Sequence, residues 1–343
     1  MAREPDSIVE MRRVRARAEY LRQNRLVEGQ ACGSFGGLSL AGWDFAAPAD
    51  ESYVEIVRET SRQLIRLDSL WGGIDVVGLA KRAFHVVRQR INTGGYPTRV
   101  ERDLHAAGAE LAEVAGWIAF DAERQELATE LNHEALYLAR LAGDRDVEHL
   151  TLLNASLQAW YLRHERKCVA TAQTVIDDGR ITSRVHAMAL VRQARAYSRM
   201  GNRADAFRTF GQAQSLFLDG VSDRDPSWAW WIDAHEIDGH FAALHTDLGD
   251  HRRGIPMLYD VVTSSNKETP RYRVVLAGRL LAELVAVRAW HDAQDIAGSL
   301  AKNTASIGSA RAITLLRSTA EELHRADAPA TLRDTIDHVI HHG

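Results

Sequence analysis

The chain has 343 residues, of which 45% are hydrophobic and 26% charged, and its formal net charge is −4. This balance is typical of a globular protein, and the net charge gives no nucleic-acid-binding signature over the chain as a whole. No apolar run approaches the ~20 residues of a membrane span, and the first residues do not resemble a secretory leader. We therefore expect a cytoplasmic protein that makes no membrane contact.

The first fifty residues differ in composition from the rest. Residues 8–26 predict an amphipathic helix with arginines between Arg12 and Arg25, and the interleaved acids favour a solvated face over a DNA contact. Residues 29–50 are rich in Gly, Ser and Ala but match neither GxGxxG nor a P-loop, which indicates a loop or linker. The two cysteines, Cys32 and Cys168, lack metal-ligand spacing, so we expect reduced structural thiols.

The clearest pattern runs from Leu190 to Ala213 and reads L-x3-A-x2-Y-x3-G-N-x3-A-x3-F-x2-A. This spacing is typical of a tetratricopeptide hairpin, in which two antiparallel helices meet at small residues. Ala194 and Ala206 take the close-approach positions, and Gly201 makes the turn. One such hairpin cannot bury its own apolar face, so further hairpins must stack on it.

Degenerate copies of the hairpin flank this one. Their turns are predicted near Ala122, Arg163, Gly249 and Arg288, with small and apolar residues at the matching positions. The spacing from turn to turn is 38 to 48 residues, longer than the consensus of about 34. The longest interval contains an additional loop, Asp219 to Pro226.

The fold class that follows is all-α, a tetratricopeptide-like superhelical solenoid of antiparallel helix pairs. No segment alternates with the period of a strand, and an irregular helical bundle is the alternative. Further helix pairs are expected at 53–91, 271–299 and 310–341. The domain division is an N-terminal helix and loop at 1–50, a capping hairpin at 51–97, degenerate repeats at 98–305 and a helical cap at 306–343.

Aligning the repeats by their turns indicates which first-helix residues face the concave groove. Arg192, Arg195 and Arg199 share one helical stripe, which we expect to be exposed. Arginine suits bidentate recognition of carboxylate, so the groove is predicted to bind a peptide, a protein segment or an acidic small ligand. A solvated ridge balanced by local acids is the alternative. The candidate ligand-binding residues are Asn154, Trp160, Arg192, Arg195, Arg199, Glu236, His240 and Arg279.

Catalytic and metal motifs are weak. His235 and Glu236 resemble the start of HExxH, but His240 follows five residues after His235, about 140° around a helix. No GxSxG motif or nucleophile–base pairing is readable. We therefore predict no metal, no cofactor and no enzymatic activity.

Three tryptophans, Trp228, Trp230 and Trp231, follow Ser227, which is a candidate N-cap for the next helix. Packing beneath the preceding loop is one interpretation of this cluster. An exposed aromatic partner site is the other, because Trp is enriched at binding hot spots.

Several motifs together resemble a known family. They are Leu67 to Gly73, Glu110 to Asp121, and Trp228 to Asp233 ahead of Asp247 to Asp250. In this order they are similar to the C-terminal sensor region of actinobacterial (Streptomyces-type) helix-turn-helix transcriptional regulators with tetratricopeptide repeats. The resemblance covers about residues 53–323 and implies architecture more than activity. The region before it lacks a helix-turn-helix pattern, so sequence-specific DNA binding is not expected.

The sequence therefore predicts a regulatory or adaptor protein in transcription or secondary metabolism, with a peptide-binding groove. One alternative is an accessory protein or enzyme of a biosynthetic pathway that binds an acidic metabolite in the same groove. Another is a DNA-binding regulator that uses the basic N-terminal helix. A homodimer is also open, since the sequence does not set the oligomeric state.

Overall fold

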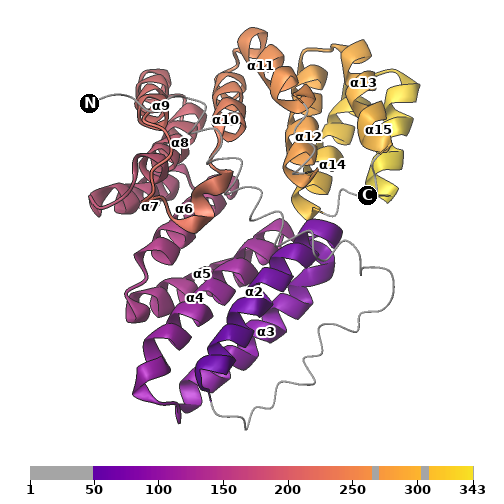
Figure 1. Cartoon of the computed structure of the whole chain (residues 1–343). Coiled ribbons are helices and arrows are strands. Elements are labelled where there is room, and N and C mark those ends of the chain that lie inside the picture. The colour runs from indigo at the N-terminus through magenta and orange to yellow at the C-terminus, as the bar shows by residue number, and fades with distance from the viewer. Residues whose placement is uncertain (1–48, 265–269, 303–308, 343) are drawn as a thin grey trace. The chain divides into compact units, whose positions relative to one another are not determined.

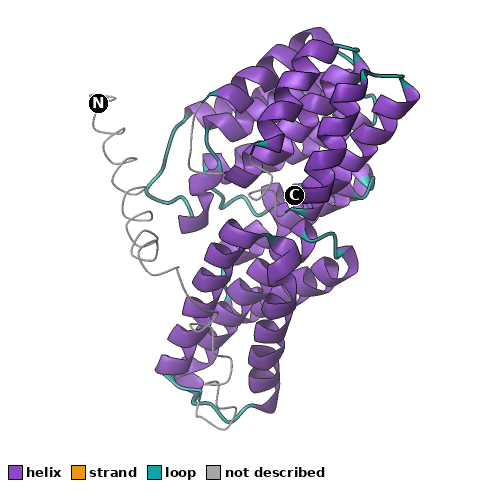
Figure 2. Cartoon of the chain, turned by 90° about the vertical axis from the view of Figure 1, so that its right-hand side faces the viewer, coloured by secondary structure: helices purple, strands orange, loops and turns teal. Residues whose placement is uncertain are grey.

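The computed structural model of the chain describes residues 49–264, 270–302 and 309–342. The predicted basic helix and nearly all of the Gly-rich loop lie outside these residues. The described part contains helices and loops and no strand, so the all-α prediction is confirmed (Figure 2). None of its helices combines the length and the apolar character needed to span a membrane.

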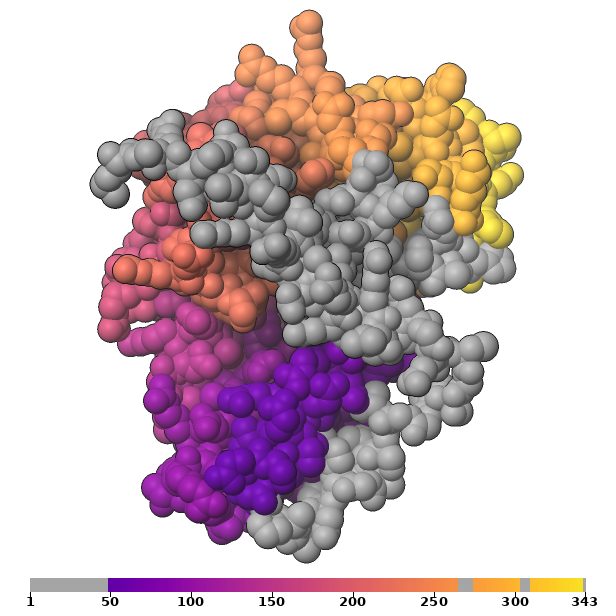
Figure 3. Space-filling model, in the orientation of Figure 1, coloured from indigo at the N-terminus to yellow at the C-terminus, as the bar shows by residue number. Residues whose placement is uncertain are grey.

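Fourteen α-helices in the described residues form consecutive antiparallel pairs, and each pair packs together (Figure 1). The pairs are α2 (Glu51–Trp71) with α3 (Gly73–Thr93), α4 (Thr98–Asp121) with α5 (Gln125–Ala142), α6 (Arg145–Tyr161) with α7 (Glu165–Asp177), α8 (Ser183–Arg199) with α9 (Arg203–Leu218), α10 (Ala234–Asp247) with α11 (His251–Thr263), α12 (Pro270–Ala286) with α13 (Trp290–Ala301), and α14 (Ala310–Arg325) with α15 (Ala330–His342). The space-filling view shows hairpins that are neighbours in sequence as neighbouring bands of colour (Figure 3).

The turns inside six of these pairs share one backbone conformation. Each contains a residue with positive φ, and the following N–H bonds to a carbonyl five residues earlier, as in the Schellman motif. The positive-φ residues are Glu123, Arg163, Gly201, Gly249, Arg288 and Asp327. Four of the five predicted turns therefore lie at the predicted residue, and the first lies one residue later. The turn at Asp327, between α14 and α15, was not recognised as a sixth copy.

The hairpin of α8 and α9 packs as its spacing predicts. Ala194, Ala206 and Phe210 are fully buried, and Tyr197 packs against the same apolar cluster. Cys168 is also fully buried, and burial raises the pKa of its thiol to about 11. This environment fits the structural role that we expected for Cys168.

Two large apolar clusters and one small one stabilise the described array from α6 onward. The first large cluster joins residues from Leu152 to Leu244, the second joins residues from Ala242 to Val339, and the small one joins Ala159, Cys168 and Ala196. Both large clusters include residues of α10, so this helix connects them. Each hairpin thus completes its core on its neighbours, which is the packing principle of a helical-repeat solenoid.

Candidate functional site

The first helices of four successive hairpins carry polar side chains at one repeated position. Nine residues before the positive-φ turn residue, α6 has Asn154, α8 has Arg192, α10 has His240 and α12 has Arg279. The turns therefore set the helices in a common register. Three of these four residues and their neighbours form one network, which we call the arginine cluster: Trp160, Arg192, Arg195, Arg199, Glu236, His240, Asp247 and Arg279.

Arg195 lies at the centre of the arginine cluster and is only 5% exposed. Its Nε donates to Oδ2 of Asp247 over 2.9 Å, and its Nη1 donates to Nδ1 of His240 over 2.9 Å. Its Nη2 is buried without a hydrogen-bond partner among the described residues. Burial lowers the pKa of Arg195 to about 10, although Asp247 opposes this shift, so the guanidinium remains charged at neutral pH.

Asp247 connects α8 to α12. It accepts hydrogen bonds from Arg195 and from Nη2 of Arg279, whose Nη2 also donates to the Ala243 carbonyl over 3.2 Å. Burial alone would raise the pKa of Asp247, but the two guanidinium groups outweigh it and the pKa is lowered. Asp247 therefore stays ionised and neutralises part of the arginine charge.

His240 lies between two guanidinium groups and one carboxylate. Burial lowers the pKa of His240 to about 4; Arg192 and Arg195 add to this shift, and Glu236 opposes it. The imidazole is therefore neutral at pH 7. Because Arg195 can only donate, Nδ1 must accept and Nε2 carries the hydrogen, which Nε2 donates to Glu236 over 3.0 Å. In this tautomer, Nη1 of Arg192, 3.0 Å from Nε2, faces another N–H group.

Trp160 of α6 forms the aromatic side of the arginine cluster. The guanidinium carbons of Arg195 and Arg199 lie 4.6 and 4.2 Å from its ring centroid, within cation–π range. Its indole N–H donates to the Arg195 carbonyl over 3.3 Å, and Nη1 of Arg199 donates to the Trp160 carbonyl over 2.6 Å. Trp160 thus fixes the orientation of both arginines.

Asn154 lies apart from the arginine cluster in its bonding. Its side chain donates to Glu113 of α4 over 2.6 Å. Burial raises the pKa of Glu113 to about 7; Glu110 adds to this shift, and Asn154 opposes it. The structure therefore places seven of the eight predicted residues in one network and gives Asn154 a separate acidic partner.

The expectation of an exposed arginine stripe is wrong. Arg192 is 4% and Arg195 is 5% exposed, and the side chain of Arg199 is only 11% exposed. The reason is that α10 packs against α8 and brings Asp247 and His240 onto the stripe. Asp247 was missed as a site residue, although it stands two residues before its turn, as Arg199 does before Gly201. That shared register was the available signal.

The tryptophan segment also departs from the prediction. Ser227 to Trp231 form a short 3-10 helix, and the N-cap of α10 is Asp233, whose side chain accepts from the Glu236 N–H over 2.9 Å. Trp228 donates to the Asp146 carbonyl over 2.9 Å and stacks on Trp231, whereas Trp230 is 49% exposed. Most of this cluster therefore packs inward, and Trp230 remains open to solvent.

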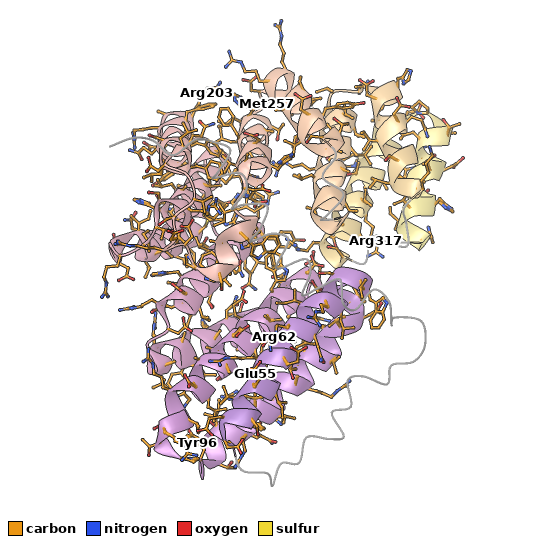
Figure 4. The ribbon with its side chains drawn as sticks, in the orientation of Figure 1. Glu55, Arg62, Tyr96, Arg203, Met257 and Arg317 are labelled. Atoms are coloured by element: carbon orange, nitrogen blue, oxygen red, sulfur yellow. The ribbon has the colours of Figure 1, made fainter. Side chains whose placement is uncertain are left out.

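Two hollows elsewhere in the described residues are alternative candidates for a binding site. A hollow of about 610 Å³ between α3, α4 and α5 includes Tyr96, His105 and Tyr137 (Tyr96 is labelled in Figure 4). Another, of about 510 Å³, lies where α2, α4 and α6 meet. Neither hollow includes a member of the arginine cluster. Among the described residues, no three His, Cys, Asp or Glu side chains are grouped to hold a metal ion.

No family model and no curated protein matches the chain. Among solved structures, the chain is similar to a Signal Transduction ATPase with Numerous Domains (STAND) protein with a tetratricopeptide repeat sensor from Pyrococcus horikoshii. The identity is 12% and the TM-score 0.43, over 84% of this chain and 44% of that one. The chain thus corresponds to less than half of that protein's length.

Proposed function

We propose that this protein is a non-enzymatic regulatory or adaptor protein whose arginine cluster binds a carboxylate-bearing peptide or protein segment. The observation that carries this proposal is the buried Nη2 of Arg195, which has no hydrogen-bond partner among the described residues. Leaving such a donor unsatisfied costs about 1–3 kcal/mol, and more when it belongs to a charged group. A ligand carboxylate would supply the missing acceptor.

The other guanidinium groups of the arginine cluster support the same conclusion. Arg195 and Arg279 share the carboxylate of Asp247, and Arg199 lies 3.9 Å from that of Glu165. A ligand carboxylate would add a further charged acceptor for these guanidinium groups.

A ligand would reach the arginine cluster through its partly exposed members. The side chains of Arg199 and Arg279 are 11% and 20% exposed, and Trp160 is also only partly buried. A carboxylate that entered beside them would compete with Asp247 for Arg279 and Arg195. Binding would thereby loosen contacts between α8, α10 and α12 and favour a second arrangement of these helices.

The regulated process is proposed from the sequence. The motifs that resemble the sensor region of actinobacterial transcriptional regulators favour a role in transcription or secondary metabolism. An acidic metabolite is the alternative ligand, because its carboxylate would satisfy the same Arg195 donor. The experiment below separates these two ligand classes.

A peptide array with matched free and amidated C-termini tests the proposal, read by fluorescence polarisation and compared with a panel of dicarboxylic acids. Arg199→Ala and Arg279→Ala should each weaken binding about tenfold or more, because a charge-assisted hydrogen bond contributes about 1.5–3 kcal/mol. Arg208→Ala is the matched control, since Arg208 lies on α9 and its side chain is 66% exposed.

Three outcomes distinguish the proposed site and ligand from their alternatives. Weaker binding in Arg199→Ala and Arg279→Ala, with unchanged binding in Arg208→Ala, supports the site. Equal losses at Arg208 would contradict it, because that arginine lies outside the arginine cluster. Binding of the dicarboxylic acids but not of any peptide would favour the metabolite alternative.

A further inference from the structure

The C-terminal end of α4 contacts the N-terminal end of α14, although about 190 residues separate them in sequence. Ser309, the N-cap of α14, donates from Oγ to Oδ1 of Asp121 over 2.9 Å. Nε and Nη2 of Arg311 donate to the same oxygen over 3.0 and 2.8 Å. A single carboxylate oxygen thus joins the second described hairpin to the last one.

Aromatic side chains complete this contact. The guanidinium carbon of Arg311 lies 4.3 Å from the ring centroid of Phe120 and 5.3 Å from that of Trp117, both on α4. Asp121 is 5% exposed, Ser309 is 1% exposed, and the side chain of Arg311 is 15% exposed. Hydrogen bonds to charged groups and cation–π contacts both strengthen when they are shielded from water. We call Asp121, Ser309, Arg311 and the two rings the clasp.

The clasp is confined to the two helix ends. Within the described residues, α4 and α14 do not pack along their lengths. The apolar cluster that holds α14 runs from Ala242 to Val339 and contains no residue of α4. Oδ2 of Asp121 is buried without a hydrogen-bond partner among the described residues. Among the described residues, α4 thus contributes nothing to the apolar cluster that holds α14, and a small, incompletely satisfied contact joins the two helix ends.

We propose that the clasp is a reversible closure that ties hairpin α4–α5 to hairpin α14–α15 and so constrains the hairpins between them. Because each hairpin packs mainly on its neighbours, small changes at successive hairpins add up between the two ends of the array. A polar point contact can separate without exposing either apolar core. The closed state is the one described here, and release of Arg311 from Asp121 gives the open state. This inference does not depend on the proposed ligand.

Distances between the two hairpins test the clasp in the full-length protein. Spin labels at Glu130→Cys on α5 and Ser318→Cys on α14 use exposed positions, and Cys32→Ser removes one of the two native thiols. Cys168 is fully buried and its raised thiol pKa disfavours labelling. Double electron–electron resonance should show one narrow distance distribution when the clasp is intact.

Arg311→Ala and Asp121→Asn should shift this distribution to longer distances and broaden it, while the circular dichroism spectrum keeps its helical form. Arg317→Ala is the matched control, because Arg317 is an exposed arginine on the same helix (Figure 4). It should leave the distribution unchanged.

Two results would overturn the proposal. One is an unchanged distance distribution in both folded clasp variants, which would show that the apolar cores alone fix the spacing. The other is global unfolding caused by the milder changes Arg311→Lys and Ser309→Ala. That result would make the contact part of the permanent core and not a closure.

Discussion

Glu113 and His240 are buried titratable groups whose pKa values are shifted in ways that disfavour the charged form. Burial raises the pKa of Glu113 to about 7 and lowers that of His240 to about 4. Each group is therefore neutral over a pH range in which its unfolded counterpart is charged. Because one is an acid and the other a base, their effects on the pH dependence of stability have opposite signs.

For Glu113, the folded protein binds one more proton than the unfolded chain between about pH 4.5 and 7, so this group's contribution to stability falls as pH rises through that range. Glu113→Gln removes the ionisation and keeps a side-chain acceptor for Asn154. We expect the variant to be more stable than the parent at pH 8, by up to about 3 kcal/mol, and close to it at pH 5. Urea denaturation at both pH values measures this. An equal change in stability at pH 5 and pH 8 would contradict the assigned pKa shift.

For His240, the unfolded chain binds the additional proton between about pH 4 and 6.5, so stability should fall as pH decreases through this range. His240→Gln should flatten that dependence, so that the free energy of unfolding changes across this pH range by on the order of 3 kcal/mol less than in the parent. This holds even where the variant is less stable than the parent at pH 7 because Arg195 is disturbed. His291→Gln is the control, because that side chain is 90% exposed. A profile as steep as the parent's would show that another group carries the dependence.

At the scale of the helices, the repeated turns allow the loss of stability caused by a non-glycine residue at positive φ to be measured. Arg163 and Arg288 adopt φ values of 63° and 58°, a conformation that glycine takes without a Cβ penalty. Both side chains are exposed. Gly201 and Gly249 already have glycine at the same turn position.

Arg163→Gly and Arg288→Gly should therefore stabilise their hairpins by about 1 kcal/mol each, measured as an increase in the denaturation midpoint. The converse change, Gly201→Ala, should destabilise by a similar amount. A Cβ at Gly201 would meet open space, so only backbone strain is tested there. Destabilisation by both glycine substitutions would mean that the arginine side chains contribute more than the strain costs.

These turns also show what could be predicted from the sequence. The spacing of small and apolar residues located five hairpin turns to within one residue, because hairpin packing depends on side-chain size at fixed positions. The turn at Asp327 was not recognised, although, like the turns at Arg163 and Arg288, it has a non-glycine residue at positive φ. The start of α10 was placed too early, because Ser227 and Asp233 both suit an N-cap and only the packing of the 3-10 segment decides between them.

The candidate site was predicted less completely for a physical reason. The common register brought most of the chosen residues together, since equivalent positions of adjacent first helices are neighbours. Their burial could not be predicted, because it depends on how closely α10 approaches α8 and on the ion pair of Arg195 with Asp247. Repeat alignment predicts which residues meet and does not predict how much water remains between them.

At the scale of the array from α6 onward, stability should be distributed over two large, linked cores. The C-terminal cluster contains Leu281 of α12, and the preceding cluster contains Phe210 of α9; both side chains are fully buried. In a helical-repeat protein each hairpin contacts mainly its neighbours, so damage to one core should spread only as far as the shared interface. Helix α10 is that interface, because it contributes residues to both clusters.

Leu281→Ala should therefore cost about 2–5 kcal/mol, and the loss should be local. Native-state hydrogen exchange is expected to accelerate in α12 to α15, while the amides of α8 and α9 keep most of their protection. Phe210→Ala is the reciprocal change and should accelerate exchange in α8 to α10 and spare α14 and α15. Uniform acceleration throughout the array by either variant would show that the two cores unfold as one cooperative unit. In that case the clasp between α4 and α14 would be a candidate for the coupling, and Arg311→Ala should restore local behaviour.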